Sequence, residues 1–282
     1  MALGLAAGSF VLLASAFRSE GPPPPRPGST ASPTDSPVPE PSDRPEPSPP
    51  PENWKFIPPT RTEGDLEVVA VTFPDGSTAE LAYPASLGLA GLGVTPYMAG
   101  CDHDFGFTHY DPRDVRYYGE PLEVYTGSSG EVGLYKSVKG WGGSDLLMFH
   151  FGPWWVDLYQ YPHERSMPEG RKDCAENLRG TLIDDGWIVL SGPPNLGLND
   201  PELWIGDLGP ERRFVILYPD RCENESTSDA TMIGGVHVDK SHEFADWCDP
   251  SGIRIHVYFE PGSTFFDDVF EGLEIRDARF AS

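Results

Sequence analysis

Apolar and polar residues alternate over short stretches through most of the chain beyond residue 60, which is the pattern of half-buried β-strands. The stretches 66–73 and 78–83 are separated by Pro74-Asp75-Gly76-Ser77, a strong turn sequence, and together they predict a β-hairpin. Turn sequences also join 122–126 to 131–138 and 146–151 to 156–161. Further strands are predicted at residues 187–190, 203–206, 214–218, 253–259 and 273–280.

Helical patterns are fewer than strand patterns and cover only 169–179, 241–247 and 264–271. The last of them follows Pro261-Gly262 and lies between the two final predicted strands. A strand–helix–strand order of this kind is typical of α+β domains. The pattern therefore predicts an α+β fold, mainly antiparallel β-sheet built of hairpins, with two or three short helices.

The alternation stops between Gly21 and Pro59, where about half of the chain's 31 prolines lie among Ser, Thr, Asp and Glu. Closely spaced prolines favour polyproline II, which rises about 3.1 Å per residue, so this segment can act as an extended stalk. A low-complexity linker without such a role is the alternative. The chain is accordingly divided into residues 1–17, a disordered proline-rich stalk 18–59, and an acidic, disulfide-containing globular domain 60–282.

The first residues indicate export. An apolar run at 3–13 is followed by Ala14-Ser15-Ala16, a small-x-small pattern typical of signal-peptide cleavage. The run is shorter than the roughly 20 residues of a transmembrane helix, and no Lys or Arg precedes it. The segment 1–17 is therefore interpreted as a signal peptide or an atypical membrane anchor. Either interpretation places the domain outside the cytoplasm, secreted or anchored to the cell membrane by its N-terminus.

The four cysteines are an even number without a C-x-x-C pair, which argues against zinc ribbons and thioredoxin-like redox motifs. In an oxidising compartment they predict two disulfides, for which three pairings are possible. We favour Cys222 with Cys248, because each lies at the end of a predicted strand. That pairing leaves Cys101 with Cys174 by elimination.

The charge of the chain limits the partners that it can have. A net charge of −24 and a pI near 4.4 argue against nucleic acid, because phosphate backbones repel an acidic domain. A solvated surface is the simplest explanation of the charge, and calcium or a cationic partner is the alternative.

Motifs for catalysis are scarce. The sequence contains no serine-hydrolase elbow, phosphate-binding loop or dinucleotide fingerprint. His242 and Asp246, with His237 before them, approach a zinc-protease helix, but an exposed polar helix explains them equally well. The cluster from Cys101 to Asp114 offers hard ligands but does not fit the calcium-loop pattern, and a disulfide-tethered acidic loop explains it better. No metal and no other cofactor is predicted.

Aromatic residues are concentrated between 141 and 161, and most of them are expected in the core. In a strand, Phe149 and Phe151 share the inward face, whereas the adjacent Trp154 and Trp155 point to opposite sides. One of those two is expected outside unless both faces are covered. Rigid aromatic surface favours recognition, so Trp141, Trp154 and Trp155 are the candidate ligand-binding residues.

The chain resembles a loosely defined group of uncharacterised exported or membrane-anchored proteins of high-GC Gram-positive bacteria in three segments: VTFPDGSTAELAYP at 71–84, GVTPY at 93–97 and FDDVFEGL at 266–273. In that group a signal or anchor precedes a variable linker and a domain of this kind. The resemblance implies an exported location. Its motifs are turn and strand elements, and they imply no reaction.

These features favour a non-catalytic, extracytoplasmic, cell-envelope-associated interaction or ligand-binding domain, with an envelope glycan or protein as its partner. Its N-terminal segment can sit in the membrane. The alternative is a secreted or cell-wall-acting hydrolase with an acidic or metal-assisted site that no motif reveals. Two carboxylates about 5 to 10 Å apart in a deep cleft, or three convergent metal ligands, favour the hydrolase.

Overall fold

The computed structural model describes residues 56–100, 107–110, 119–128, 130–136, 145–159, 168–207, 213–219, 231–233, 236–240 and 243–281, all within the compact unit Glu46–Ser282. Every strand pair among them is antiparallel, and three short α-helices accompany the strands. The fold is therefore α+β and mainly antiparallel β, as predicted. Within these ranges, no helix has the length and apolar character that a membrane span needs. The predicted signal or anchor 1–17 and the stalk up to residue 55 lie outside the described residues.

The first sheet has four strands and contains the two that the turn 74–77 was predicted to join. Its order is β1-β2-β3-β18, formed by Thr60–Glu63, Leu66–Thr72, Thr78–Pro84 and Glu274–Arg279. The backbone N–H and the hydroxyl of Ser77 each donate a hydrogen bond of 2.8 Å to the Asp75 carboxylate. Gly76 between them has a φ of 91°, which a side chain disfavours. The turn sequence thus fixes the register of β2 on β3.

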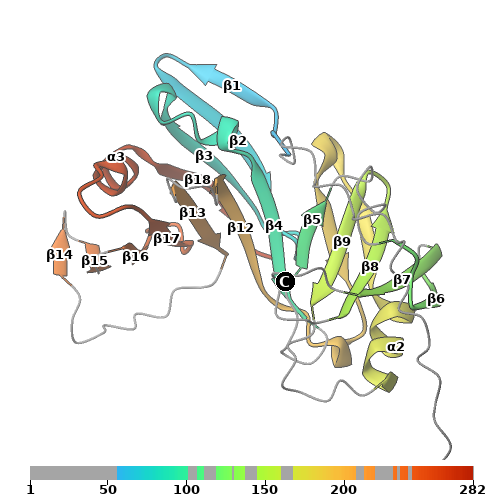
Figure 1. Cartoon of the computed structure of the whole chain (residues 1–282). Helices are drawn as coiled ribbons and strands as arrows, with labels where there is room; N and C mark the ends of the chain where they lie inside the picture. The colour runs from blue at the N-terminus through green and yellow to red at the C-terminus, as the bar shows by residue number, and fades with distance from the viewer. Residues whose placement is uncertain are drawn as a thin grey trace, which may run out of the picture. The chain divides into compact units, whose positions relative to one another are not determined.

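The second sheet has seven strands in the order β14-β15-β16-β17-β13-β12-β4, and it joins segments that are distant in sequence (Figure 1). The edge strand β4 pairs with β12, although several other strands lie between them along the chain. The bounds in chain order are Val94–Ala99 for β4, Asn199–Asp207 for β12, Arg213–Tyr218 for β13, Thr231–Ile233 for β14, Val236–Lys240 for β15, Phe244–Cys248 for β16 and Arg254–Tyr258 for β17.

A first hydrophobic core unites the four-stranded and seven-stranded sheets. Val71 of β2 belongs to the same buried cluster as Leu203 of β12 and Val257 of β17. Helix α3, Phe265–Gly272, adds Phe266, which is 2% exposed. Burying an apolar side chain of this size contributes about 2 kcal/mol to stability, so this core stabilises both sheets together.

A single helical turn, α1 (Leu89–Leu92), connects β3 to β4. The backbone N–H of Ala90 has no intrahelical acceptor at this position. It donates a hydrogen bond of 3.0 Å to the buried hydroxyl of Tyr83. The tyrosine therefore stabilises the start of the helix.

The third sheet has five strands in the order β5-β9-β8-β7-β6. Phe149, Phe151 and Trp154 contribute to a second core, together with Cys174 of α2 and Ile188 of β11. The bounds are Phe107–Tyr110 for β5, Glu123–Gly127 for β6, Gly130–Lys136 for β7, Asp145–Phe151 for β8, Trp154–Tyr159 for β9, Pro168–Asn177 for α2, Arg179–Leu182 for β10 and Ile188–Ser191 for β11, of which the last two pair with each other.

Phe56 links the two cores. Its ring lies 5.2 Å from that of Trp154, in the second core, and 4.9 Å from that of Trp187, in the first. The backbone of Phe56 also bridges to Val94 at the start of β4. Packed structure therefore begins before residue 60, where the globular domain was predicted to start.

The predicted helix at 241–247 is wrong, because Phe244–Cys248 forms strand β16. Ala245 and Trp247 are buried while Phe244, Asp246 and Cys248 are partly exposed, which is a period of two. So short a stretch fits either periodicity, and pairing with β15 and β17 decides the outcome. The helices predicted at 169–179 and 264–271 are confirmed as α2 and α3.

Candidate functional site

The seven-stranded sheet has two different faces. Ala245, Val257 and Leu203 point into the first core, and successive strand residues point to opposite sides. Their neighbours therefore form the other side, which we call the outer face. It includes Tyr97, Glu202, Trp204, Phe214, Ile216, Tyr218, Phe244, Asp246, Arg254, His256 and Tyr258.

Rings on the outer face contact one another from strand to strand. The centroids of Tyr97 on β4 and Trp204 on β12 lie 5.6 Å apart. Trp204 lies 5.8 Å from Phe214 on β13, with ring planes that differ by 7°. Phe214 stacks in turn on Tyr258 of β17 at 4.3 Å. Four adjacent strands thus contribute to one continuous aromatic surface.

The row continues to the fifth strand. His256 lies 4.6 Å from Tyr258 on the same strand, and Phe244 of β16 stacks on His256 at 5.0 Å. All of these rings are half-buried. We call the six residues the ring row: Tyr97, Trp204, Phe214, Phe244, His256 and Tyr258.

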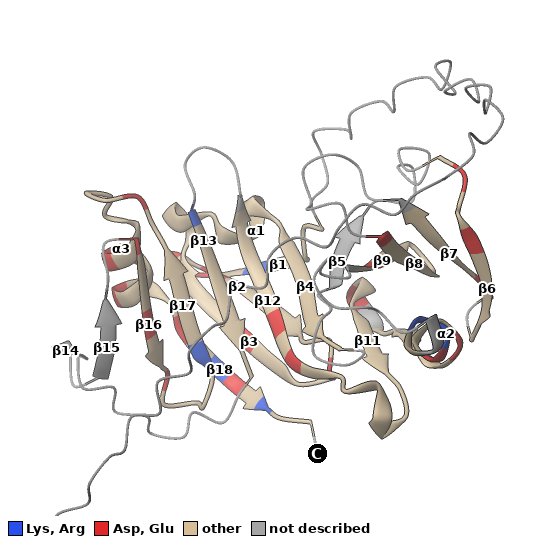
Figure 2. Ribbon diagram, turned by 60° about the horizontal axis from the view of Figure 1, so that its bottom comes forward, with Lys and Arg blue, Asp and Glu red and all other residues tan. Residues whose placement is uncertain are grey.

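Glu202 is the acidic group of the outer face next to the ring row. The Trp204 Nε1 donates a hydrogen bond of 2.5 Å to its Oε2 atom. Burial raises the pKa of Glu202 to about 7, and the negative charge of Asp200 acts in the same direction, whereas the Trp204 hydrogen bond opposes it. Figure 2 shows acidic positions on β12, the strand next to the edge strand β4. Glu202 is thus a half-buried carboxyl group that changes its charge near neutral pH.

Polar groups from the neighbouring strands lie beside Glu202. Burial, and then the charge of Glu202, raise the pKa of Tyr218. Beyond Tyr218 across the sheet, Arg254 forms an ion pair with Asp246, with its Nη2 atom 2.6 Å and its Nε atom 2.9 Å from Oδ2. Burial lowers the pKa of His256, although Asp246 acts in the opposite direction. The outer face therefore combines aromatic rings with ionisable groups that burial has perturbed, which is typical of functional sites.

The outer face was not predicted as a site from the sequence. The available signal was an alternation within single strands, as in Glu202 and Trp204 or His256 and Tyr258, where residues two positions apart are both polar or aromatic. It indicates a strand with two occupied faces. It does not indicate which strands are neighbours.

The candidate ligand-binding tryptophans are not brought together. Trp154 is 2% exposed, and its Nε1 donates a hydrogen bond of 2.7 Å to the carbonyl of Gly186 in the protein interior. It is therefore a core residue and cannot contact a ligand directly. Trp155 is half-buried on the opposite side of β9, where it stacks on His150 at 4.5 Å. Trp141 lies outside the described residues.

The structure also alters the interpretation of the candidate metal ligands. A helical spacing of His242 and Asp246 is wrong, because Asp246 lies on a strand and pairs with Arg254. The acidic cluster 101–114 lies outside the described residues, except for the backbone of β5. In the part of the chain that the structure describes, no three His, Cys, Asp or Glu side chains are grouped as metal ligands.

Cys174 and Cys248 are both disulfide-bonded. Cys174 is 1% exposed within the second core. Cys101 and Cys222 lie outside the described residues, so the pairings 101–174 and 222–248 stay predictions.

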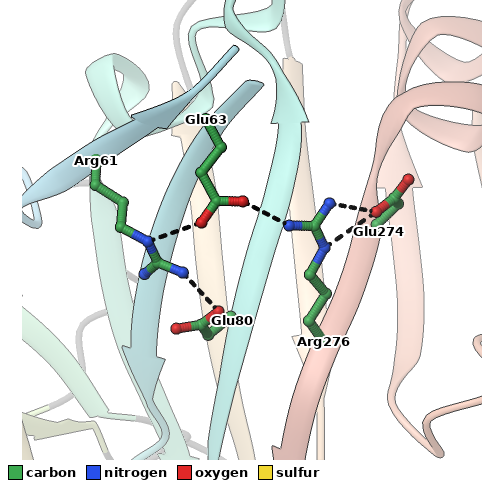
Figure 3. Close-up of polar contacts among 5 residues, drawn as sticks. All are labelled: Arg61, Glu63, Glu80, Glu274 and Arg276. Atoms are coloured by element: carbon green, nitrogen blue, oxygen red, sulfur yellow. Dashed lines mark hydrogen bonds and ion pairs between the residues drawn. The ribbon is translucent and has the colours of Figure 1, made fainter. Parts of the chain in front are cut away.

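A separate charged cluster lies on the four-stranded sheet (Figure 3). Arg61 donates hydrogen bonds of 3.1 Å to Glu63 and 2.8 Å to Glu80. Arg276 donates bonds of 3.0 Å to Glu63 and 2.6 Å to Glu274. The charges thus satisfy one another across β1, β3 and β18, and the Arg61 hydrogen bond lowers the pKa of Glu80. Exposed pairs of this kind contribute little to stability, and each charged group of the cluster already has a partner within it, so the outer face is the better candidate site.

A comparison of the chain with protein-family models, curated proteins and solved structures found no match.

Proposed function

We propose that the chain is an extracytoplasmic, cell-envelope-associated domain that binds its ligand through the outer face of the seven-stranded sheet. The observation that carries the proposal is the ring row, which crosses five strands on the side opposite the core. An antiparallel sheet with one face in water usually has polar side chains on that face. An aromatic face is instead typical of a recognition surface, where Tyr, Trp and Phe are enriched.

The contacts between the rings suit them to binding. Phe214 packs between Trp204 and Tyr258. These contacts already hold the three rings in place before a ligand binds. Little side-chain entropy is then lost on binding, which favours affinity. Glu202 and Tyr218 beside the rings provide the few polar groups that orient a ligand. An envelope glycan or protein is the expected ligand, and the acidic charge of the chain disfavours anionic ones.

A hydrolase is the second candidate, and one observation favours it. The pKa of Glu202 near 7 is suited to a general acid or base. Its neighbour Tyr218 supplies a second group that can hold a proton. The outer face would then bind a wall polymer and cleave it.

The experiment measures binding of the full chain to purified cell-wall glycan and to membrane protein in separate assays. Tyr97→Ser removes the ring at the edge of the row, and Leu122→Ser removes an apolar side chain that is 56% exposed and lies outside the outer face. Circular dichroism verifies that both variants are folded. Weaker binding by Tyr97→Ser alone supports the proposal, whereas equal binding by both variants and the wild type contradicts it. Release of soluble products that stops in Glu202→Gln supports the hydrolase.

A further inference from the structure

Two rings of the ring row, Tyr97 and Trp204, lie beside Glu202, a carboxyl group without a cationic partner among the described residues. Glu202 accepts one hydrogen bond, from Trp204, and no Lys, Arg or His of the described residues forms an ion pair with it. Asp200, on its own strand, adds a second negative charge nearby. A half-buried carboxyl group without a counter-ion is costly to ionise, so a cation at this position would be stabilised.

The outer face already contains one example of such a pair. Arg254 directs its guanidinium group at Asp246 through Nε and Nη2, on the same side of the sheet. Tyr218 is the register partner of Arg254. The negative charges of Glu202 and Asp246 both raise the pKa of Tyr218. Glu202 lies on β12, next to the strand of Tyr218, and Asp246 lies on β16, two strands away on the other side. Among the described residues, Asp246 has an arginine partner and Glu202 has none.

Rings beside Glu202 are suited to a planar cation. Tyr97 is the register partner of Glu202 on β4, and Trp204 lies next to it on the same face. Tyrosine and tryptophan rings attract cations within about 6 Å, and guanidinium groups stack on them. The net charge of −24 and the acidic residues on several elements in Figure 2 attract a cation from solution.

We propose that the outer face binds a guanidinium group of its ligand, with the Glu202 carboxylate as the counter-ion and Tyr97, Trp204 and Tyr218 around it. The inference rests on the proposed function, because it names the chemistry of the ligand that the outer face binds. The partner is thus an arginine-bearing peptide or protein of the envelope. A neutral glycan is the alternative outcome of the test.

Binding of a cation has a consequence for protons. Glu202 ionises near pH 7, and the groups that face it are Asp200 and Trp204 on β12, Tyr97 on β4 and Tyr218 on β13, with Arg254 and Asp246 beyond. A bound guanidinium favours the ionised carboxylate, so binding at neutral pH releases a proton. Affinity therefore rises with pH through the pKa of Glu202 and levels off above it.

The experiment titrates the full chain with N-acetyl-L-arginine amide and with its uncharged isostere N-acetyl-L-citrulline amide, by calorimetry at constant ionic strength. We expect the arginine probe to bind roughly tenfold more tightly at about pH 8 than at about pH 6, because the ionised fraction of Glu202 rises by that factor. Buffers of different ionisation enthalpy report the released proton. The citrulline probe is expected not to bind.

Two variants complete the test. Glu202→Gln should abolish binding of the arginine probe and its pH dependence. Glu271→Gln removes the same unit of charge from an exposed position on α3, and it should retain both properties. Equal binding of the two probes, or arginine binding that survives Glu202→Gln, overturns the inference. If neither probe binds while Tyr97→Ser still weakens binding to the envelope fractions, the inference fails and the proposed function stands.

Discussion

The indole Nε1 of Trp204 donates a hydrogen bond of 2.5 Å to Oε2 of Glu202, two positions earlier on the same strand. Both side chains lie on the outer face because strand residues two apart share a side. The bond holds the carboxyl group against the ring row in either protonation state, since a neutral carboxyl oxygen still accepts a hydrogen bond. Glu202 can therefore change its charge without losing its position.

The first prediction concerns stability and pH. Burial raises the pKa of folded Glu202 to about 7 from an ordinary value of 4.5. The stabilising contribution of its protonated form is thus complete below about pH 4.5 and is lost as the pH rises to about 7. Glu202→Gln cannot ionise, so its free energy of unfolding should exceed that of the wild type by about 2 kcal/mol above pH 7, allowing for partial exposure.

Urea denaturation at a series of pH values measures this difference. Glu271→Gln is the control, because it removes an exposed carboxylate and should show no such dependence. A difference between Glu202→Gln and the wild type that stays constant from acid to neutral pH contradicts the raised pKa.

The second prediction separates the adjacent tryptophans. Trp154→Phe leaves the Gly186 carbonyl without its donor and opens space in the second core, so it should lower the free energy of unfolding by about 3 kcal/mol. Trp155→Phe should cost much less, because the buried Trp155 Nε1 has no hydrogen-bond partner among the residues that the structure describes, and its ring is only half-buried. Chemical denaturation of both variants provides the comparison. Equal losses would mean that the two sides of β9 are packed alike.

The tryptophan pair also illustrates what the sequence could predict. The alternation of strand residues correctly placed Phe149 and Phe151 in the core and Trp154 and Trp155 on opposite sides. It could not predict which side is covered, because α2 and β11 supply the cover from elsewhere in the chain. The assignment of Trp154 to a recognition surface failed for this reason.

The ring row could not be predicted from the sequence for a related reason. Its contacts depend on register between segments that are distant in sequence, such as β4 with β12 and β13 with β17. A pattern within one strand identifies its faces, but no pattern states that Tyr97 lies opposite Glu202. Local signals were sufficient for β2, β3 and α3, whose elements and turns are contiguous.

The third prediction concerns oxidation. Because Cys174 and Cys248 are disulfide-bonded, reduction should lower the melting midpoint of the full chain, with a loss of about 3 kcal/mol for each bond that opens. Cys174 is buried, so reduction should require partial unfolding and be slow. Thermal melting with and without reductant, with thiol counting by mass spectrometry, measures the effect. Four free thiols under non-reducing conditions and an unchanged midpoint would contradict both the disulfides and the export prediction.

The last prediction tests whether the ring row acts as a unit. Phe214 stacks on Tyr258 at 4.3 Å, and aromatic pairs contribute about 1 kcal/mol beyond their buried area. In a double-mutant cycle of Phe214→Leu and Tyr258→Leu, the loss of unfolding free energy in the double variant should be smaller than the sum of the single losses by that amount. Phe270 contacts Trp247 and Phe266 on the opposite side of the sheet, so Phe214→Leu and Phe270→Leu should be additive within about 0.5 kcal/mol. Additivity in both cycles would show that the rings of the outer face are energetically independent. It would contradict the preorganised surface on which the proposed function depends.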